Sequence, residues 1–144
     1  MAVVAGLICL QAGGVAAAED AITHSVTISD AWAPATAPGA RTAAVYLTLA
    51  NRGDADVLLH ASSSAAGKVE FHTHVHRDGM MTMTELPSVD VPTDGILSFE
   101  PHGDHLMLIG LVRPLAPGDE VTVTLEFRDA GRMEFHAEVR DIRR

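Results

Sequence analysis

The chain has 144 residues, which is enough for one domain with a hydrophobic core. Aromatic residues make up only 4% of the sequence, so valine, leucine, isoleucine and alanine must fill most of the interior. The formal net charge of −9 argues against nucleic acids and anionic membranes as partners, because proteins bind both through clustered lysines and arginines.

Residues 1–18 form an apolar segment without a charged side chain. A run that closes on an Ala-x-Ala site is typical of a secretory signal peptide, so we predict a signal peptide over residues 1–18, cleaved after Ala18, and one domain over residues 19–144. Glycines interrupt the segment and it is short for a bilayer, so we expect no membrane span in the mature chain. Its cysteine, Cys9, is the only one in the sequence. The exported domain would then have neither a disulfide nor a thiolate ligand.

The rest of the sequence alternates polar and apolar residues over short stretches that glycines and prolines separate. This pattern is typical of β-strands and not of long amphipathic helices. The segment between residues 29 and 44 contains Pro34, Pro38 and Gly39 and is predicted to be a loop. Short strands joined by such turns indicate an all-β sandwich or barrel. The predicted strands span residues 22–29, 44–51, 57–61, 69–76, 80–86, 96–100, 105–111, 120–127 and 132–139.

Histidine and methionine are concentrated in one part of the sequence. Five of the eight histidines and four of the six methionines lie in the range 72–107. In a strand, residues two apart point to the same face. His105 and Met107 therefore project together, whereas Leu106 and Leu108 point to the opposite face, toward the core.

A second group lies on a predicted hairpin that turns at Asp78-Gly79. The strand before the turn carries three histidines on one face, namely His72, His74 and His76. The strand after the turn carries one pair of residues on each face, Met81 with Met83 and Met80 with Thr82. A hairpin brings one of these pairs opposite the histidines.

The chemical types of these side chains favour copper(I) as the bound metal ion. Thioether sulfur is soft and neutral, which suits copper(I) better than zinc, magnesium or calcium, and imidazole also binds copper well. A set of two imidazoles and two thioethers adds no negative charge, and it contains no thiols that an oxidising compartment would convert to a disulfide. The residues alone support His105 and Met107 beside a histidine face. They leave open which histidine and which methionine complete the set.

The spacing of four of these residues resembles the ligand signature of the PCuAC family of periplasmic copper chaperones. Ten residues separate His72 from Met83, twenty-one separate Met83 from His105, and one separates His105 from Met107. The resemblance covers about residues 25–140, and it selects His72 and Met83 from the alternatives. The flanking segments that carry it are Asp30-Ala31-Trp32-Ala33, residues 44–49, Val69-Glu70-Phe71-His72 and His105-Leu106-Met107-Leu108.

This resemblance implies a cupredoxin-like Greek-key β-sandwich or barrel. It implies a periplasmic protein, not an enzyme, that holds one copper(I) ion with His72, Met83, His105 and Met107. It also implies that the metal passes to the copper centre of a cytochrome c oxidase subunit or to a thiol-bearing assembly protein. The alternative is a periplasmic copper storage or resistance protein without specific delivery.

Four residues near the predicted ligands are candidates for lesser roles. His74 and His76 could form an auxiliary site for copper(II), zinc or nickel, or they could simply be a solvent-exposed polar face. His102 and Met81 are candidates for contacts that support the ligands without binding the metal. A redox or dismutase-type enzyme that uses the histidine-rich strand is the competing class. It is disfavoured because a blue-copper centre needs a cysteine ligand.

Overall fold

The computed structural model describes residues 25–143, and within this range the chain forms ten β-strands. This described part contains no helix that is long and apolar enough to cross a membrane. The predicted signal peptide over residues 1–18 and its cleavage after Ala18 lie outside the described residues. The strands are β1 (Val26–Pro34), β2 (Thr42–Asn51), β3 (Asp56–Ser63), β4 (Ala66–Arg77), β5 (Met80–Leu86), β6 (Val89–Val91), β7 (Ile96–Phe99), β8 (His105–Leu111), β9 (Glu120–Phe127) and β10 (Gly131–Arg140).

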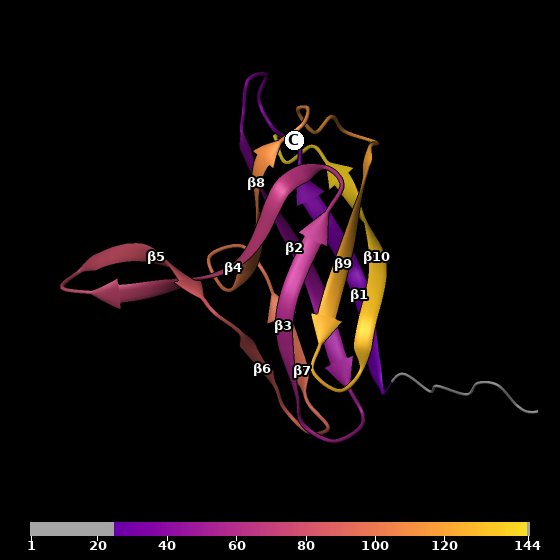
Figure 1. The fold of residues 1–144 in the computed structure, drawn as a ribbon. Coiled ribbons are helices and arrows are strands. Elements are labelled where there is room, and N and C mark those ends of the chain that lie inside the picture. The colour runs from indigo at the N-terminus through magenta and orange to yellow at the C-terminus, as the bar shows by residue number, and fades with distance from the viewer. Residues whose placement is uncertain (1–24, 144) are drawn as a thin grey trace, which may run out of the picture.

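Seven of the strands close into a barrel (Figure 1). The hydrogen-bonded order is β4-β8-β2-β1-β10-β9-β3, and the pairing of Ala61 in β3 with Val69 in β4 closes the ring. Strand β5 pairs with β4, β6 pairs with β3, and β7 pairs with β2. The neighbouring strands are antiparallel except β1 and β10, which are parallel. The all-β fold predicted from the alternating pattern is confirmed.

The alternating pattern places one side of each barrel strand in a shared core. On β2, Val45, Leu47 and Leu49 are at most 1% exposed, and the residues between them lie on the other face. On β8, Leu106 and Leu108 are fully buried, as predicted, which turns the residues on either side of Leu106 away from the core. Burying one large aliphatic side chain contributes about 1.5–3 kcal/mol. This core therefore fixes the positions of the side chains that point away from it.

Two segments differ from the prediction. Strand β1 does not end at Ser29 but continues to Pro34, so the first part of the predicted loop is strand. Asp30 has a positive φ of 51°, and the register with β2 shifts there, which marks a β-bulge. The proline ends the strand, where a missing N–H is tolerated. Strand β6 was not predicted, because three residues are too few to show an alternating pattern.

The β4–β5 hairpin extends away from the barrel as an arm (Figure 1). Strand β4 pairs with β8 as far as His72, and beyond it β5 is the only partner of β4 among the described strands. The hairpin turns at Asp78 (φ 53°) and Gly79 (φ 74°). Positive φ at both positions of a two-residue loop is the type I′ turn, which matches the twist of the flanking strands. We call residues 73–84 the hairpin arm.

Candidate functional site

The strand order aligns aromatic and histidine rings in a row across the barrel, on the face opposite the core. Trp32 on β1 pairs with Tyr46 on β2, and His105 on β8 pairs with His72 on β4. The ring centroids are 4.9 Å apart for Trp32 and Tyr46, 6.4 Å for Tyr46 and His105, and 5.7 Å for His105 and His72. Residues far apart in the sequence therefore form one continuous surface.

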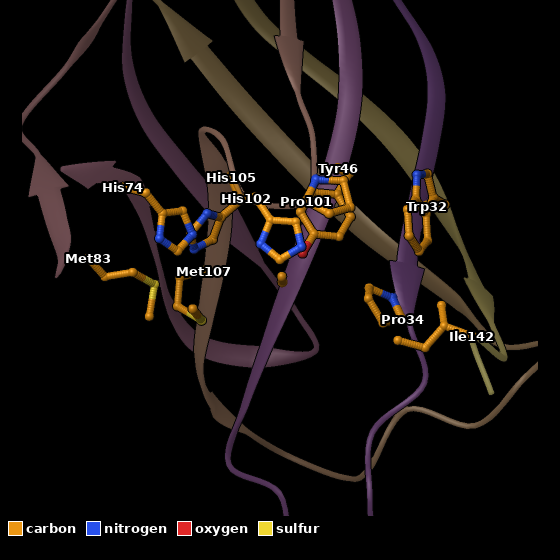
Figure 2. Close-up of a pocket in the computed structure, with 11 residues that line it drawn as sticks. Trp32, Pro34, Tyr46, His74, Met83, Pro101, His102, His105, Met107 and Ile142 are labelled. Carbon is orange, nitrogen blue, oxygen red and sulfur yellow. The ribbon is translucent and has the colours of Figure 1, made fainter. Parts of the chain in front are cut away.

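A pocket opens on this row (Figure 2). Figure 2 shows the rings of His74 and His105 side by side, with the thioether groups of Met83 and Met107 next to them. We call this the His–Met pocket. Aromatic and aliphatic side chains form its other end. Its lining residues are Trp32, Pro34, Ala44, Tyr46, His74, Met83, Pro101, His102, His105, Met107 and Ile142.

His105 is held in one tautomer by the backbone. Its side chain is buried, with 4% of the residue exposed, and its Nδ1 donates a hydrogen bond of 3.1 Å to the carbonyl oxygen of Gly103. A carbonyl can only accept, so Nδ1 carries the proton and the neutral ring keeps its lone pair on Nε2. Burial lowers the pKa of His105, and the neighbouring His74 and His72 lower it further, against the Gly103 bond that raises it. The ring is therefore neutral at pH 7, and its Nε2 can donate a lone pair to a metal ion.

His72 is oriented by a carboxylate. Its Nε2 lies 2.8 Å from Glu70 Oε2, and Glu70 Oε1 lies 2.7 Å from Lys68 Nζ. The hydrogen bond from Lys68 lowers the pKa of Glu70, and the one from His72 lowers it further, so Glu70 remains a carboxylate. A carboxylate can only accept, so Nε2 donates this hydrogen bond, and in the neutral form of the ring the lone pair is on Nδ1. That Nδ1 is buried and has no hydrogen-bond partner.

The register of the hairpin arm shows which methionines face the histidines. His74 lies opposite Met83, and His76 lies opposite Met81. Of the two sets left open by the sequence, Met81 with Met83 therefore shares the histidine face. Met80 lies opposite Arg77, on the other face.

The structure brings together three of the four predicted ligands in the His–Met pocket, namely Met83, His105 and Met107. His72 lies beside the ring of His105 but does not line the pocket, where His74 lies 5.4 Å from His105 instead.

The residues predicted for lesser roles divide in the same way. His102 lines the pocket, with a positive φ of 68°. His76 and Met81 lie outside it on the exposed arm. The contact of Glu70 with His72 was not predicted from the sequence, although the position of Glu70 two residues before His72 on one strand face could have indicated it. The role of the Gly103 carbonyl has no signal in the sequence, because any residue has this group.

Comparisons with known sequences identify a family. The family model LpqE-like, described as "Putative lipoprotein LpqE-like", matches residues 26–139. A protein of Leifsonia xyli subsp. xyli named "Putative lipoprotein Lxx21020" is 34% identical over 117 residues, which cover 81% of this chain and 70% of that protein.

Solved structures share the fold. The copper-bound PCuAC domain from PmoF2 superposes with a TM-score of 0.70 at 22% identity, over 81% of this chain and 93% of that one. The solution structure of CuI-DR1885 from Deinococcus radiodurans gives a TM-score of 0.64 at 33% identity, over 78% of this chain and 76% of that one. The resemblance to PCuAC domains and the cupredoxin-like fold that it implies are confirmed.

Proposed function

The chain belongs to the LpqE-like family, and from this premise we propose that it is a periplasmic copper(I) carrier that delivers its ion toward cytochrome c oxidase. Two imidazoles and two thioethers hold the ion. The proposed ligands are His72, Met83, His105 and Met107. The names of similar structures support the choice of metal, since one is a copper-bound PCuAC domain and another is CuI-DR1885. The lipoprotein names in the family support export.

The observation that carries the proposal is that His105 on β8 and His72 on β4 lie side by side, each with one ring nitrogen left without a hydrogen bond in the described part of the chain. The free lone pair of His105 is on Nε2, because Nδ1 donates its hydrogen bond to the carbonyl oxygen of Gly103. In the neutral form of His72 the free lone pair is on Nδ1, because Nε2 donates its hydrogen bond to Glu70, and Nδ1 is buried without a partner. A buried acceptor without a partner costs about 1–3 kcal/mol. A metal ion bound between these rings would remove that cost.

The thioethers determine which metal suits the site. Met107 lies on the same face of β8 as His105, and Met83 reaches the same pocket from the hairpin arm. Neutral sulfur and nitrogen ligands favour copper(I) over copper(II), zinc and calcium, which prefer anionic or oxygen ligands. Copper supplies no reaction in this role. It is a cargo ion that keeps its charge while the protein holds it.

The exposure of Met83 favours delivery over storage. This residue is 48% exposed, so an incoming ligand of a recipient protein can approach the ion on that side. A storage site would gain from enclosing all of its ligands. The recipient is a copper-binding domain of the oxidase or an assembly protein with thiol ligands, which bind copper(I) more strongly than thioethers and so draw it forward.

The test is a copper(I) titration of the purified protein, under anaerobic conditions, against a colorimetric chelator of known affinity. We expect one tightly bound equivalent, and a loss of more than about 100-fold in affinity when Met83→Ala and Met107→Ala are combined, since changes outside the ligand shell alone cost about 10–100-fold. Met80→Ala is the matched control, because Met80 is exposed on the opposite face of the arm. Wild-type affinity in the double variant would show the ligand assignment to be wrong.

A second measurement separates delivery from storage. The copper-loaded protein is mixed with a purified copper domain of the oxidase and the two are separated by ion exchange. Copper found on the oxidase domain supports the carrier. Copper retained by this protein, with excess acceptor present, would favour storage or resistance.

A further inference from the structure

We propose that the hairpin arm carries an outer copper(I) site, formed by His76 and Met81 together with the adjacent pair His74 and Met83, through which the ion enters and leaves the His–Met pocket. This inference rests on the proposed function, because it takes copper(I) as the cargo. It adds a second binding position to that function and a route between the two positions.

The turn geometry brings the side chains of each pair close together. The type I′ turn at Asp78-Gly79 makes Arg77 and Met80 the hydrogen-bonded pair that closes the loop. Pairs alternate along an antiparallel ladder, so the next pair, His76 and Met81, is non-hydrogen-bonded. So is the pair His74 and Met83, two residues further from the turn. In such pairs the Cα atoms are only about 4.5 Å apart and the side chains are at their closest.

The two pairs also share one face of the arm. Successive residues on one face of a strand are about 7 Å apart, which the imidazole and the thioether side chains can bridge from both ends. The register runs without a shift from Phe71 opposite Leu86 to Arg77 opposite Met80, so no bulge separates the pairs. The arm therefore presents two imidazoles and two thioethers together, the same donor set as the proposed inner site. The opposite face offers instead the pairs Thr73 with Thr84, Val75 with Thr82 and Arg77 with Met80.

Exposure distinguishes the outer pairs from the inner site. Met81 is 53% exposed and His76 is exposed, whereas His105 is 4% exposed. The ring of His74 lies 5.4 Å from that of His105, and both His74 and Met83 line the His–Met pocket. The pairs thus lead from open solvent, along one face of the arm, to the pocket wall. An ion at the tip can pass inward by exchanging one ligand at a time.

The transfer needs no change of charge. Imidazole nitrogen and thioether sulfur bind a metal as uncharged ligands, so the ion keeps its single positive charge at each position and no electron moves with it. Met83 belongs to both positions, which lets it hold the ion while His76 and Met81 release it and the inner ligands bind it. The outer position is weaker because its ligands are exposed to water and held on two strands outside the barrel.

The experiment compares the double variant His76→Ala with Met81→Ala against Met80→Ala, an exposed methionine on the other face of the same arm. Silver(I), a redox-inert analogue of copper(I), is titrated while the methionine methyl signals are followed by NMR. We expect the first equivalent to shift the Met107 methyl. The second, held by His74, His76 and Met81 while Met83 binds the first ion, should shift that of Met81. In stopped-flow mixing with excess chelator, we expect the double variant to lose copper(I) several-fold more slowly than wild type, with unchanged affinity for the first equivalent. Met80→Ala should behave as wild type.

The possible failures are distinguishable. A Met81 methyl that stays unshifted at excess silver(I), or wild-type loss of copper(I) in the double variant, would overturn the outer site and leave the carrier function intact. A first equivalent that does not shift the Met107 methyl would overturn the proposed function itself. Retention of the first equivalent by the double variant also shows that it is folded.

Discussion

The two sides of the His–Met pocket differ in how they are built. His105 and Met107 lie on β8, which is paired on one edge with β2 and on the other with β4. Met83 lies on β5, which has β4 as its one partner among the described strands. Met83 itself is 48% exposed. The barrel side therefore holds its proposed ligands in fixed positions, whereas the arm side leaves its proposed ligand open to solvent. The proposed carrier function needs both properties, and this chain assigns them to different strands.

We expect the largest loss of copper(I) affinity from removing a proposed ligand on the barrel side of the pocket. His105→Ala removes the neutral, buried imidazole and leaves the carbonyl of Gly103 without its partner, so we expect copper(I) affinity to fall by more than about 100-fold. A competition titration measures it. His136→Ala is the control, because this histidine is exposed and hydrogen-bonded to Thr122 on the far side of the barrel. A greater loss in His74→Ala than in His105→Ala would reverse the comparison.

The second prediction concerns the stability of the barrel. Asp56 is 6% exposed, and its carboxylate accepts hydrogen bonds from the backbone N–H groups of Val57, Asp129 and Ala130 at 2.7, 2.9 and 2.9 Å. Hydrogen bonds to charged groups contribute about 1.5–3 kcal/mol. We expect Asp56→Ala to lower the free energy of unfolding by about 2–3 kcal/mol in urea titrations. Met83→Ala on the arm should change it by less than about 0.5 kcal/mol, as exposed positions usually do.

The same carboxylate gives a pH dependence. Burial raises the pKa of Asp56, but the three backbone donors and the charge of Arg128 outweigh it, so the folded pKa lies below the usual 3.8. The stabilisation is therefore complete above that value and is lost as the pH falls through the folded pKa. We expect the acid limb of the stability curve to be flatter in Asp56→Asn. Equal slopes in the two proteins would contradict this origin.

The third prediction tests whether Glu70 orients His72. Glu70→Ala should weaken copper(I) binding by about tenfold, because loss of a group that orients a ligand costs about 10–100-fold. Glu70→Gln should retain part of the affinity, since its amide oxygen can still accept from Nε2. Glu85→Ala is the control, because Glu85 lies opposite His72 on β5. The nitrogen shifts of the His72 ring report the tautomer, and an unchanged tautomer in Glu70→Ala would contradict the assignment.

The smallest expected effect is local to the arm. Gly79 has a φ of 74°, and no atom lies within 4 Å of a Cβ built there, so Gly79→Ala meets backbone strain alone, of about 1 kcal/mol. Amide hydrogen exchange should become faster in the hairpin arm, while global unfolding stays unchanged. Gly67→Ala on β4 is the control, because this glycine lacks a positive φ and its added Cβ makes only ordinary contacts. Faster exchange across the whole barrel would show that the arm and the barrel open together.

Much of the fold could be predicted from the sequence, because alternation is a local property. The bounds predicted for the strands at 80–86, 105–111 and 120–127 agree with the structure. The β-bulge at Asp30 and the short β6 were missed, since both depend on pairing with distant strands. The closure of the barrel through the pairing of Ala61 in β3 with Val69 in β4 has no local signal either.

For the site, the sequence predicted which residues share a strand face, but not which of them bind a metal. Alternation alone placed His105 beside Met107, and it placed His72, His74 and His76 on one face. Alternation could not choose among these histidines, because every second residue of a strand points to the same face. The structure separates them by environment: His72 contacts Glu70, His74 lines the pocket, and His76 lies on the exposed arm. The choice of ligand remains a prediction from family spacing.

The parallel pairing of β1 with β10 has a consequence for the order of folding. Trp32 pairs with Glu138, so almost the whole described chain must be present before the barrel can close. Contacts between such distant residues form slowly, in milliseconds to seconds, whereas an isolated hairpin forms in about 1–10 μs. During folding, the histidine and methionine pairs of the arm therefore come together long before His105 is buried. Metal added to the folding chain would first meet the arm.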